Sequence, residues 1–206
     1  MPETPRPPVV FLDRDGVLNE LVRDPRSGHW ESPYAPGDVV VPTDAIEAVR
    51  RLRGVGATVV VVSNQPAAAK GTATMGDLNA VSDAVLAQFA RADLTFDLVL
   101  YCHHHPAGVT PHLSGLCDCR KPEPGLLLRA GEALSLGDLS GAWLIGDSDV
   151  DIQAGSAVGA RTVLVEEPLS AHRRSGAVEP DYRVPSVLSA VQLVVEDATG
   201  RSSGDT

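Results

Sequence analysis

Short runs of apolar residues alternate along the chain with longer stretches in which apolar residues recur every three to four positions. The short runs are typical of buried strands, because a strand covered on both faces has no polar alternation. We predict five such strands, which are Val9–Leu12, Ala57–Val62, Leu98–Cys102, Trp143–Gly146 and Thr162–Val165. The longer stretches predict four helices, near Thr43–Arg53, Met75–Ala92, Pro124–Ser135 and Asp149–Gly159.

This alternation predicts an α/β fold with a central parallel sheet covered by helices on both faces. The chain shows no internal repeat, and we predict a single domain over residues 9–197. The composition of the tails, residues 1–8 and 198–206, predicts disorder. Residues Glu20–Pro42 are rich in turn formers and predict an irregular loop, which either contacts a substrate or packs Trp30 and Tyr34 on the surface.

Composition and charge narrow the classes of function. The chain has 206 residues, enough for one domain with a sizeable core, and carries a formal net charge of −10. An acidic chain argues against broad nucleic-acid binding, although a local pocket can still bind a phosphorylated small molecule. No apolar run is long enough to span a bilayer, and the first eight residues lack the apolar stretch of a secretory signal. We therefore expect a cytoplasmic protein without membrane or nucleic-acid partners, and solvated arginine clusters at 50–53 and 173–174.

Two carboxylates follow the first predicted strand, within the segment Phe11–Asn19. Where the strand passes into a loop, Asp13 and Asp15 can face one pocket, so that one attacks phosphorus and the other transfers protons. Gly16 allows the chain to turn sharply away. Because Asp-Gly is also a common turn, a turn without catalytic chemistry is the alternative.

Two further motifs offer groups that bind phosphate. Ser63 follows the second predicted strand, where its hydroxyl can donate to a phosphoryl oxygen or simply begin a loop. Arg120 and Lys121 precede a proline, and they can hold phosphate and stabilise developing negative charge. The alternative for this basic pair is a solvated surface.

An acidic cluster follows the strand Trp143–Gly146 and contains Asp147, Asp149 and Asp151. Carboxylates suit a hard cation such as Mg²⁺, although acids are also favourable at the N-terminus of a helix. Three of the four motifs lie at the ends of predicted strands, and the carboxyl ends of parallel strands meet at one edge of the sheet. We therefore expect one site there.

The three cysteines lie close together beside histidines, in residues 102–119. An odd number of cysteines in a cytoplasmic chain argues against a disulfide framework. Four side chains make a closed structural zinc set, namely Cys102, His104, Cys117 and Cys119. His103 or His105 can replace His104, and a loop without metal is the alternative. The ion would fix the loop that presents Arg120 and Lys121.

The order of the motifs resembles that of the haloacid dehalogenase superfamily of phosphohydrolases, over residues 9–165. The resemblance implies a Rossmann-like, three-layer core and a Mg²⁺-dependent hydrolysis of phosphomonoesters. By this resemblance Asp13 is the nucleophile, which forms an aspartyl-phosphate, and Asp15 is first the general acid and then the base. The predicted elements fill the intervals between the motifs, so we expect no cap domain.

The same resemblance implies that Ser63 and Lys121 bind the transferring phosphoryl group. The magnesium ligands it implies are Asp13, the main-chain carbonyl of Asp15, and Asp147, with Asp151 as a supporting acid.

The cysteine segment, taken with Asp13–Asn19, resembles the heptose bisphosphate phosphatases and the related histidinol-phosphate phosphatase domains. The resemblance implies a monomer that removes the 7-phosphate of a heptose 1,7-bisphosphate in nucleotide-heptose biosynthesis. It implies contacts to the sugar or its second phosphate from Asn64, Gln65, Arg120 and Ser148. The chain departs from the family at Pro66–Gly71 and at His103. Two alternatives remain, a histidinol-phosphate phosphatase and a non-catalytic, zinc-stabilised binding module.

Overall fold

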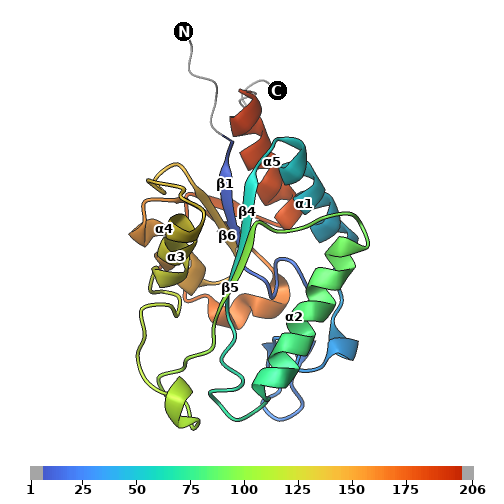
Figure 1. The fold of residues 1–206 in the computed structure, drawn as a ribbon, viewed down its shortest axis with the longest axis vertical. Coiled ribbons are helices and arrows are strands. Elements are labelled where there is room, and N and C mark those ends of the chain that lie inside the picture. The colour runs from blue at the N-terminus through green and yellow to red at the C-terminus, as the bar shows by residue number, and fades with distance from the viewer. Residues whose placement is uncertain (1–6, 201–206) are drawn as a thin grey trace.

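The structure, a computed structural model, describes residues 7–200 (Figure 1). Its centre is a six-stranded sheet in the order β5-β4-β1-β6-β7-β8, in which every neighbouring pair is parallel. The strands are β1 (Val9–Leu12), β4 (Thr58–Asn64), β5 (Leu98–Cys102), β6 (Trp143–Gly146), β7 (Arg161–Val165) and β8 (Tyr182–Val184). A separate antiparallel hairpin consists of β2 (Val22–Arg23) and β3 (Trp30–Glu31).

Five helices cover the two faces of the sheet. They are α1 (Thr43–Gly54), α2 (Met75–Ala90), α3 (Gly125–Ala133), α4 (Asp149–Ala157) and α5 (Val187–Thr199). Three short 3₁₀ helices lie in loops, η1 (Pro36–Asp38), η2 (Pro111–Leu113) and η3 (Pro168–Arg173). Figure 1 shows α3 and α4 on one side of the strands and α1, α2 and α5 on the other, which makes three layers. No helix within residues 7–200 is long and apolar enough to cross a membrane.

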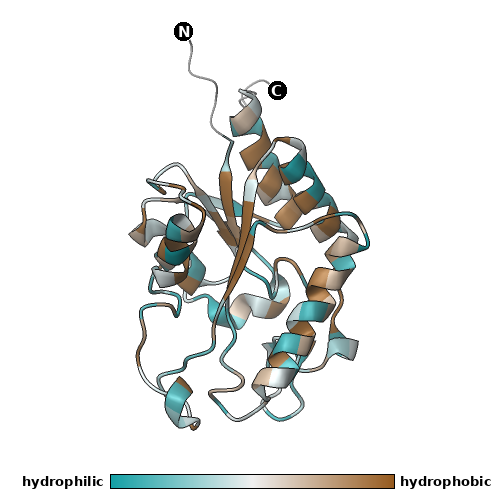
Figure 2. Cartoon of the chain, viewed as in Figure 1, coloured by the Kyte–Doolittle hydropathy of each residue, from teal (hydrophilic) through white to brown (hydrophobic). Residues whose placement is uncertain are grey.

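The alternation of side chains along each strand divides the core between these two faces. Val10 and Leu12 of β1 pack in the cluster that holds the buried residues of α1, α2 and α5. Phe11 points the other way, into the cluster formed with α3 and α4. Because both faces are covered, the strands carry apolar residues at successive positions, and Figure 2 shows them as a hydrophobic centre.

The structure confirms the predicted α/β class, the five strands and the four helices, with ends that differ by at most two residues. It adds β8 and α5, which sequence analysis missed. The apolar residues of α5, Val187, Ala190, Val191 and Val194, follow helical spacing and are buried against the sheet.

Two predicted boundaries need correction. Residues 20–42 are not wholly irregular, because they contain the β2–β3 hairpin and η1. The predicted tail at 198–206 begins too early, since α5 continues to Thr199 and ends at Gly200 in the left-handed conformation. At the other end, the Pro8 carbonyl accepts a hydrogen bond from the Thr58 amide and so extends the pairing of β1 with β4. The remaining predicted tail residues, 1–6 and 201–206, lie outside the described residues.

The sheet order puts β1 in the middle, between β4 and β6. All strands are parallel, so their carboxyl ends lie at one edge, the lower one in Figure 1, where the loops gather. The residues that follow β1, β4, β5 and β6 therefore meet at this edge.

Replacement of Phe89 by alanine tests the core under α2. Phe89 is fully buried and its ring meets Phe96 edge-on, with centroids 5.0 Å apart. We expect Phe89→Ala to lower the free energy of unfolding by about 3–5 kcal/mol in urea, because it leaves a cavity in the core. Val40→Ala is the control, since Val40 is 48% exposed, and it should change stability by less than about 0.5 kcal/mol. A loss below about 1 kcal/mol for Phe89→Ala would contradict this packing.

Candidate active site

Asp13 is the first residue after β1, and it lies against a buried lysine. The amide of Asp13 donates to the Ile145 carbonyl of β6, which fixes the backbone. Lys121 Nζ donates to Asp13 Oδ1 at 2.9 Å, to Asp151 Oδ1 at 2.5 Å and to the Val62 carbonyl at 2.7 Å. One ammonium thus joins the ends of β1 and β4 to the start of α4.

Electrostatics hold this lysine in its charged form. Burial alone would lower the pKa of Lys121, but the carboxylates of Asp13 and Asp151 outweigh that effect and raise it. Burial raises the pKa of Asp13, and the charge of Lys121 opposes the rise. Lys121 and Asp13 therefore form a buried ion pair, in which loss of either charge would leave the other charge unpaired in the protein interior.

Asp147 completes a cluster of three acids. One carboxylate oxygen from each of Asp13, Asp147 and Asp151 lies within 4.8 Å of the others. Asp147 is fully buried, and neither of its carboxylate oxygens has a hydrogen-bond partner among residues 7–200. Burial raises the pKa of Asp147 to about 8, and the neighbouring charge of Asp13 adds to the rise. Unpaired buried carboxylate oxygens beside a second acid fit a bound divalent cation.

The acids of the cluster differ in how many of their oxygens are already used. One carboxylate oxygen of Asp151 accepts a hydrogen bond from Lys121 Nζ. The other accepts from the Ser148 hydroxyl at 2.5 Å and from the Ser148 amide at 3.2 Å. Asp151 caps α4, and both of its oxygens already accept hydrogen bonds, in contrast to those of Asp147. Asp149 accepts from the amide and hydroxyl of Ser175, away from the cluster.

The loop after β1 passes so close to Asp147 that only glycine fits at position 16. Gly16 has φ +90°, and a Cβ built on it would lie 2.2 Å from Asp147 Oδ2. Because the chain passes so close to Asp147, the backbone that adjoins Asp15 lies beside the acid cluster. It agrees with the predicted use of Gly16 for a sharp turn.

Asp15 lies in a dense hydrogen-bond network. Its carboxylate pairs with Arg14 at 3.0 Å and accepts from Gln65 Nε2 at 2.6 Å, Ser32 Oγ at 2.9 Å and Asn19 Nδ2 at 3.0 Å. Burial would raise the pKa of Asp15, but the charge of Arg14 and the bonds from Asn19 and Gln65 lower it below its usual value. In this arrangement Asp15 is a charged carboxylate, the form that accepts a proton.

The two predicted sugar contacts at the end of β4 have their side chains occupied by hydrogen bonds within the protein. Gln65 is 1% exposed and bonds Asp15, Arg14 and Ser63, so it lies beneath the cavity. The Asn64 amide pairs in both directions with the backbone of Lys121, at 2.9 and 3.0 Å. Both side chains position the groups around them.

A cavity of about 290 Å³ opens above these groups, a size that suits a small molecule. Eight of the residues predicted for the site line it: Asp13, Asp15, Ser63, Asn64, Arg120, Lys121, Ser148 and Asp151. Four polar residues that sequence analysis did not assign also line it: Glu31, Ser32, Lys70 and Arg173. The wall thus includes the hairpin within residues 20–42, whose contact with a substrate was one of two open predictions.

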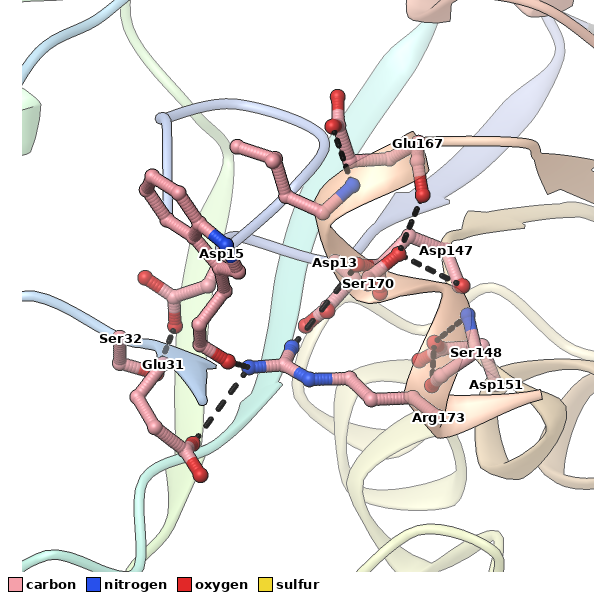
Figure 3. A network of polar contacts seen from close by, with 12 residues as sticks. Asp13, Asp15, Glu31, Ser32, Asp147, Ser148, Asp151, Glu167, Ser170 and Arg173 are labelled. Atoms are coloured by element: carbon pink, nitrogen blue, oxygen red, sulfur yellow. Dashed lines mark hydrogen bonds and ion pairs between the residues drawn. The ribbon is translucent and has the colours of Figure 1, made fainter. Parts of the chain in front are cut away.

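The prediction that Arg173 and Arg174 form a solvated cluster is wrong. Arg173 lies at the end of η3 and reaches toward Glu31 and Asp147, with nitrogen–oxygen distances of 3.6 and 3.8 Å (Figure 3). Arg174 donates to the Asp147 carbonyl at 2.9 Å. The sequence signal was the position of both residues shortly after β7, at the edge of the sheet where the site lies.

The cysteine cluster forms a second candidate metal centre. The three sulfur–sulfur distances among Cys102, Cys117 and Cys119 are 3.1, 3.4 and 3.6 Å, and all three thiols are free. His104 Nδ1 lies 3.5 Å from the Cys119 sulfur and 3.8 Å from that of Cys102. Tetrahedral zinc with bonds of about 2.3 Å places its sulfurs roughly 3.8 Å apart, so the four atoms fit one ion.

The three neighbouring histidines differ in the groups that they contact. His103 Nδ1 contacts the Gln65 carbonyl at 3.2 Å, and His105 Nδ1 accepts from the Ala107 amide at 3.2 Å. His104 faces the thiols, and its carbonyl accepts from Arg120 Nη1 at 3.2 Å. The cysteine cluster is thereby linked to an arginine of the cavity.

Comparisons with known proteins agree with this geometry. A family model described as HAD-hydrolase-like matches residues 118–190. A D-glycero-beta-D-manno-heptose-1,7-bisphosphate 7-phosphatase of Escherichia coli K12 is 34% identical over 91% of this chain and 93% of that protein. One from Pseudomonas aeruginosa is 36% identical over 77% of this chain and 80% of that protein. A solved D,D-heptose 1,7-bisphosphate phosphatase from B. bronchiseptica, complexed with magnesium and phosphate, has a TM-score of 0.74 at 25% identity, over 92% of this chain and 99% of that one.

The two lysines of the chain provide a matched test of the buried ion pair. We expect Lys121→Met to lower the free energy of unfolding by about 3–5 kcal/mol at pH 8, because it leaves buried carboxylates unpaired. Lys70→Met should change it by less than about 0.5 kcal/mol, since Lys70 is exposed.

The loss in Lys121→Met should depend on pH. Burial raises the folded-state pKa of Asp13 above its unfolded value, and without the opposing charge of the ammonium this pKa rises further. Stability is then full at low pH and falls as the pH rises through the folded pKa, so the loss should be smaller at pH 5 than at pH 8. Urea unfolding at both pH values measures this, and an equal loss at both would contradict the assignment.

Proposed function

Because this chain belongs to the D-glycero-beta-D-manno-heptose-1,7-bisphosphate 7-phosphatases, a family of HAD-like phosphatases, we propose that it removes the 7-phosphate of a D-glycero-D-manno-heptose 1,7-bisphosphate. The observation that carries the proposal is the placement of Asp13 at the floor of the cavity, between Lys121 and Asp147. Nucleophile, cation and metal-binding acid there occupy one small volume, as hydrolysis of a phosphomonoester requires.

Asp13 attacks phosphorus in the proposed reaction. The bond from its carboxylate oxygen to phosphorus forms while the bond from phosphorus to the sugar oxygen breaks, which leaves an aspartyl-phosphate. Asp15 gives its proton to the leaving sugar oxygen and then takes a proton from the water that hydrolyses the intermediate. The phosphate dianion that binds beside Asp15 raises the pKa of this carboxyl and so favours its protonated form for the first step.

Lys121 and Ser63 bind the phosphoryl group in this proposal. The Lys121 ammonium is charged, and it already contacts the attacking carboxylate. The Ser63 oxygen accepts from Gln65 Nε2 at 3.1 Å, which leaves the hydroxyl hydrogen free to donate into the cavity. Both groups offset negative charge on the phosphoryl oxygens.

Mg²⁺ fits the acid cluster, because both oxygens of Asp147 lack partners and Asp13 lies beside them. Asp13, Asp147 and the main-chain carbonyl of Asp15 would hold the ion, with Asp151 in support. When bound, Mg²⁺ offsets the repulsion between the attacking carboxylate and the phosphate dianion.

The sugar and its second phosphate would occupy the upper part of the cavity. Arg120 is the contact that we propose for the second phosphate, since this cationic residue lines the cavity and is adjacent to Lys121 in the chain. The Ser148 hydroxyl lines the cavity too, although it donates to Asp151. Asn64 and Gln65 act by holding Lys121 and Asp15.

We also propose a structural zinc ion at Cys102, His104, Cys117 and Cys119. Its support is the inward convergence of three thiols and one imidazole, and the direct chain connection from Cys119 to Arg120 and Lys121. A fully protein-bound ion has no open position for substrate.

The remaining proposals concern organisation. We infer one catalytic domain without a cap and a monomeric, cytoplasmic enzyme in the synthesis of nucleotide-activated heptose. The six-stranded sheet, whose strand ends carry the site, supports one catalytic domain, and the similarity to heptose-1,7-bisphosphate 7-phosphatases supports the pathway.

A substrate panel tests the activity. Phosphate release should be measured with Mg²⁺ from both anomers of the heptose 1,7-bisphosphate, histidinol phosphate and simple sugar phosphates. We expect one heptose bisphosphate to lead in kcat/KM by about 100-fold, roughly 2.7 kcal/mol of transition-state discrimination. Asp13→Asn should lose at least about 10³-fold in rate, because the attacking carboxylate is gone. If histidinol phosphate leads, the proposed substrate is wrong, and if Asp13→Asn is fully active, the mechanism is wrong.

Metal analysis tests the zinc site. We expect about one zinc per purified chain, and a loss of that zinc in Cys117→Ser with a fall in Tm of about 5–15 °C. His105→Ala is the matched control and should retain zinc, because His105 Nδ1 accepts from the Ala107 amide and His105 is not part of the cluster of ligand atoms. Zinc that persists in Cys117→Ser and disappears in His105→Ala would refute the assigned ligands.

A further inference from the structure

Arg173 enters the cavity from the side opposite the other cations. The sheet order places β4 and β5 on one side of β1, and β6 and β7 on the other. Lys70 follows β4, and Arg120 and Lys121 follow β5, so all three approach from the first side. Arg173 follows β7 and is the cavity-lining cation of the second side within the described residues.

The segment that carries Arg173 is anchored to the acid cluster. Arg174 donates from Nη1 to the Asp147 carbonyl at 2.9 Å and to Ser170 Oγ at 2.8 Å. Its Nη2 donates to the Glu167 carbonyl at 2.9 Å. Ser170 is fully buried, and Figure 3 shows it between Glu167 and Asp147. This bonding fixes η3 directly over Asp147, and Arg173 projects from its last position.

The guanidinium of Arg173 is poorly matched to its present partners. Its contacts are 3.4 Å to the Trp30 carbonyl, 3.6 Å to Glu31 and 3.8 Å to Asp147. A guanidinium has five N–H donors, yet among residues 7–200 this one makes a single hydrogen bond. The side chain is 22% exposed and lines the cavity, and its unbonded nitrogens are not sealed in the core, so they can donate to a molecule in the cavity. Unused donors on a mostly buried cation, aimed into a cavity, suit an anion with several oxygens.

A cation bound by Asp147 would strengthen the preference of Arg173 for an anionic ligand. Metal bound by Asp147 offsets the charge that now attracts Arg173, and it leaves Glu31 as the main anionic partner of the guanidinium. A phosphoryl group over Asp13 would restore a negative partner between the metal and the arginine.

We propose that Arg173 binds the phosphoryl group attacked by Asp13, on the side opposite Lys121, and that Glu31 holds the guanidinium when no phosphate is present. The inference rests on the proposed function. It assigns the transferring phosphate to a clamp formed by Lys121 and Arg173, and it leaves Arg120 and Lys70 for the rest of the substrate.

Inorganic phosphate is the probe, because it contains the transferring group without a sugar. With Mg²⁺ present, its dissociation constant by calorimetry should rise about 10- to 100-fold in Arg173→Ala, the range for lost hydrogen bonds to charged groups. Arg173→Lys should recover part of the affinity, and added guanidinium ion should restore phosphate binding to Arg173→Ala. Arg50→Ala is the matched control, since Arg50 pairs with Glu47 on the surface of α1, and it should leave the constant unchanged.

The variant Glu31→Gln helps to decide whether Arg173 binds phosphate or only balances the charge of nearby carboxylates. If Glu31 competes with phosphate for Arg173, this variant should bind phosphate more tightly than wild type. If Arg173 only balances the charge of Asp147, then Arg173→Ala will lower Tm and bind phosphate as well as wild type, which overturns the proposal. Phosphate binding is read without turnover, so it still reports on Arg173 if the substrate panel contradicts the proposed activity.

Discussion

The active-site end of the molecule depends on one buried ammonium. Lys121 Nζ is bonded to two carboxylates and a main-chain carbonyl, from three segments that are far apart in the chain. A charge withdrawn from water to 2% exposure is tolerated only when all its donors have partners, so the three segments cannot shift independently. The Asn64 amide fixes the backbone of the same lysine, and Cys119 lies two residues earlier. The contacts of Lys121 therefore hold the sheet and the cysteine loop in fixed positions relative to each other.

Close approach of backbone segments is the second constraint, and it explains two glycines. A Cβ at Gly16 would collide with Asp147 Oδ2, and one at Gly146 would lie 2.3 Å from Asp151 Cβ. Without side chains at these positions, two strand ends can bring their acids within 4.8 Å of one another. Packing and electrostatics oppose each other here, because burial raises the pKa of Asp13 and Asp147, and the nearby carboxylates add to the rise. A bound cation resolves that conflict.

The sequence predicted the parts of the site that follow directly from strand ends. Asp13, Ser63 and Asp147 each follow an apolar run, and in a parallel sheet this places them at a common edge. The direction in which a side chain points was not predictable, because Asn64 and Gln65 are adjacent to Ser63 yet turn toward Lys121 and Asp15. The chemistry of thiols and imidazole predicted a metal loop with His104 as the fourth ligand and His103 or His105 as alternatives, and the geometry places His104 with the thiols.

Elements without a strong local pattern were missed for a related reason. The strand β8 has three residues, two of them exposed, so it carries no apolar run. The site role of Arg173 arises because η3 folds back over Asp147, a tertiary event held by Arg174 and Ser170. A pair of arginines looks like a solvated surface unless the fold of the following segment is known.

The walls of the cavity carry several polar groups that can select the substrate. The β2–β3 hairpin supplies Glu31, and the next residue, Ser32, donates to Asp15, the group that we propose for proton transfer to the leaving oxygen. Lys70, Arg120 and Arg173 place positive charge on both sides of the floor. A substrate with one phosphate satisfies only part of this charge, whereas one with two phosphates at opposite ends of a polyol can satisfy both the floor and a wall. Because Glu31 adds a negative group to the same rim, uncharged hydroxyls rather than a third anion should fill the space between. Charge placement can thus select a sugar bisphosphate on an open α/β core without a separate lid.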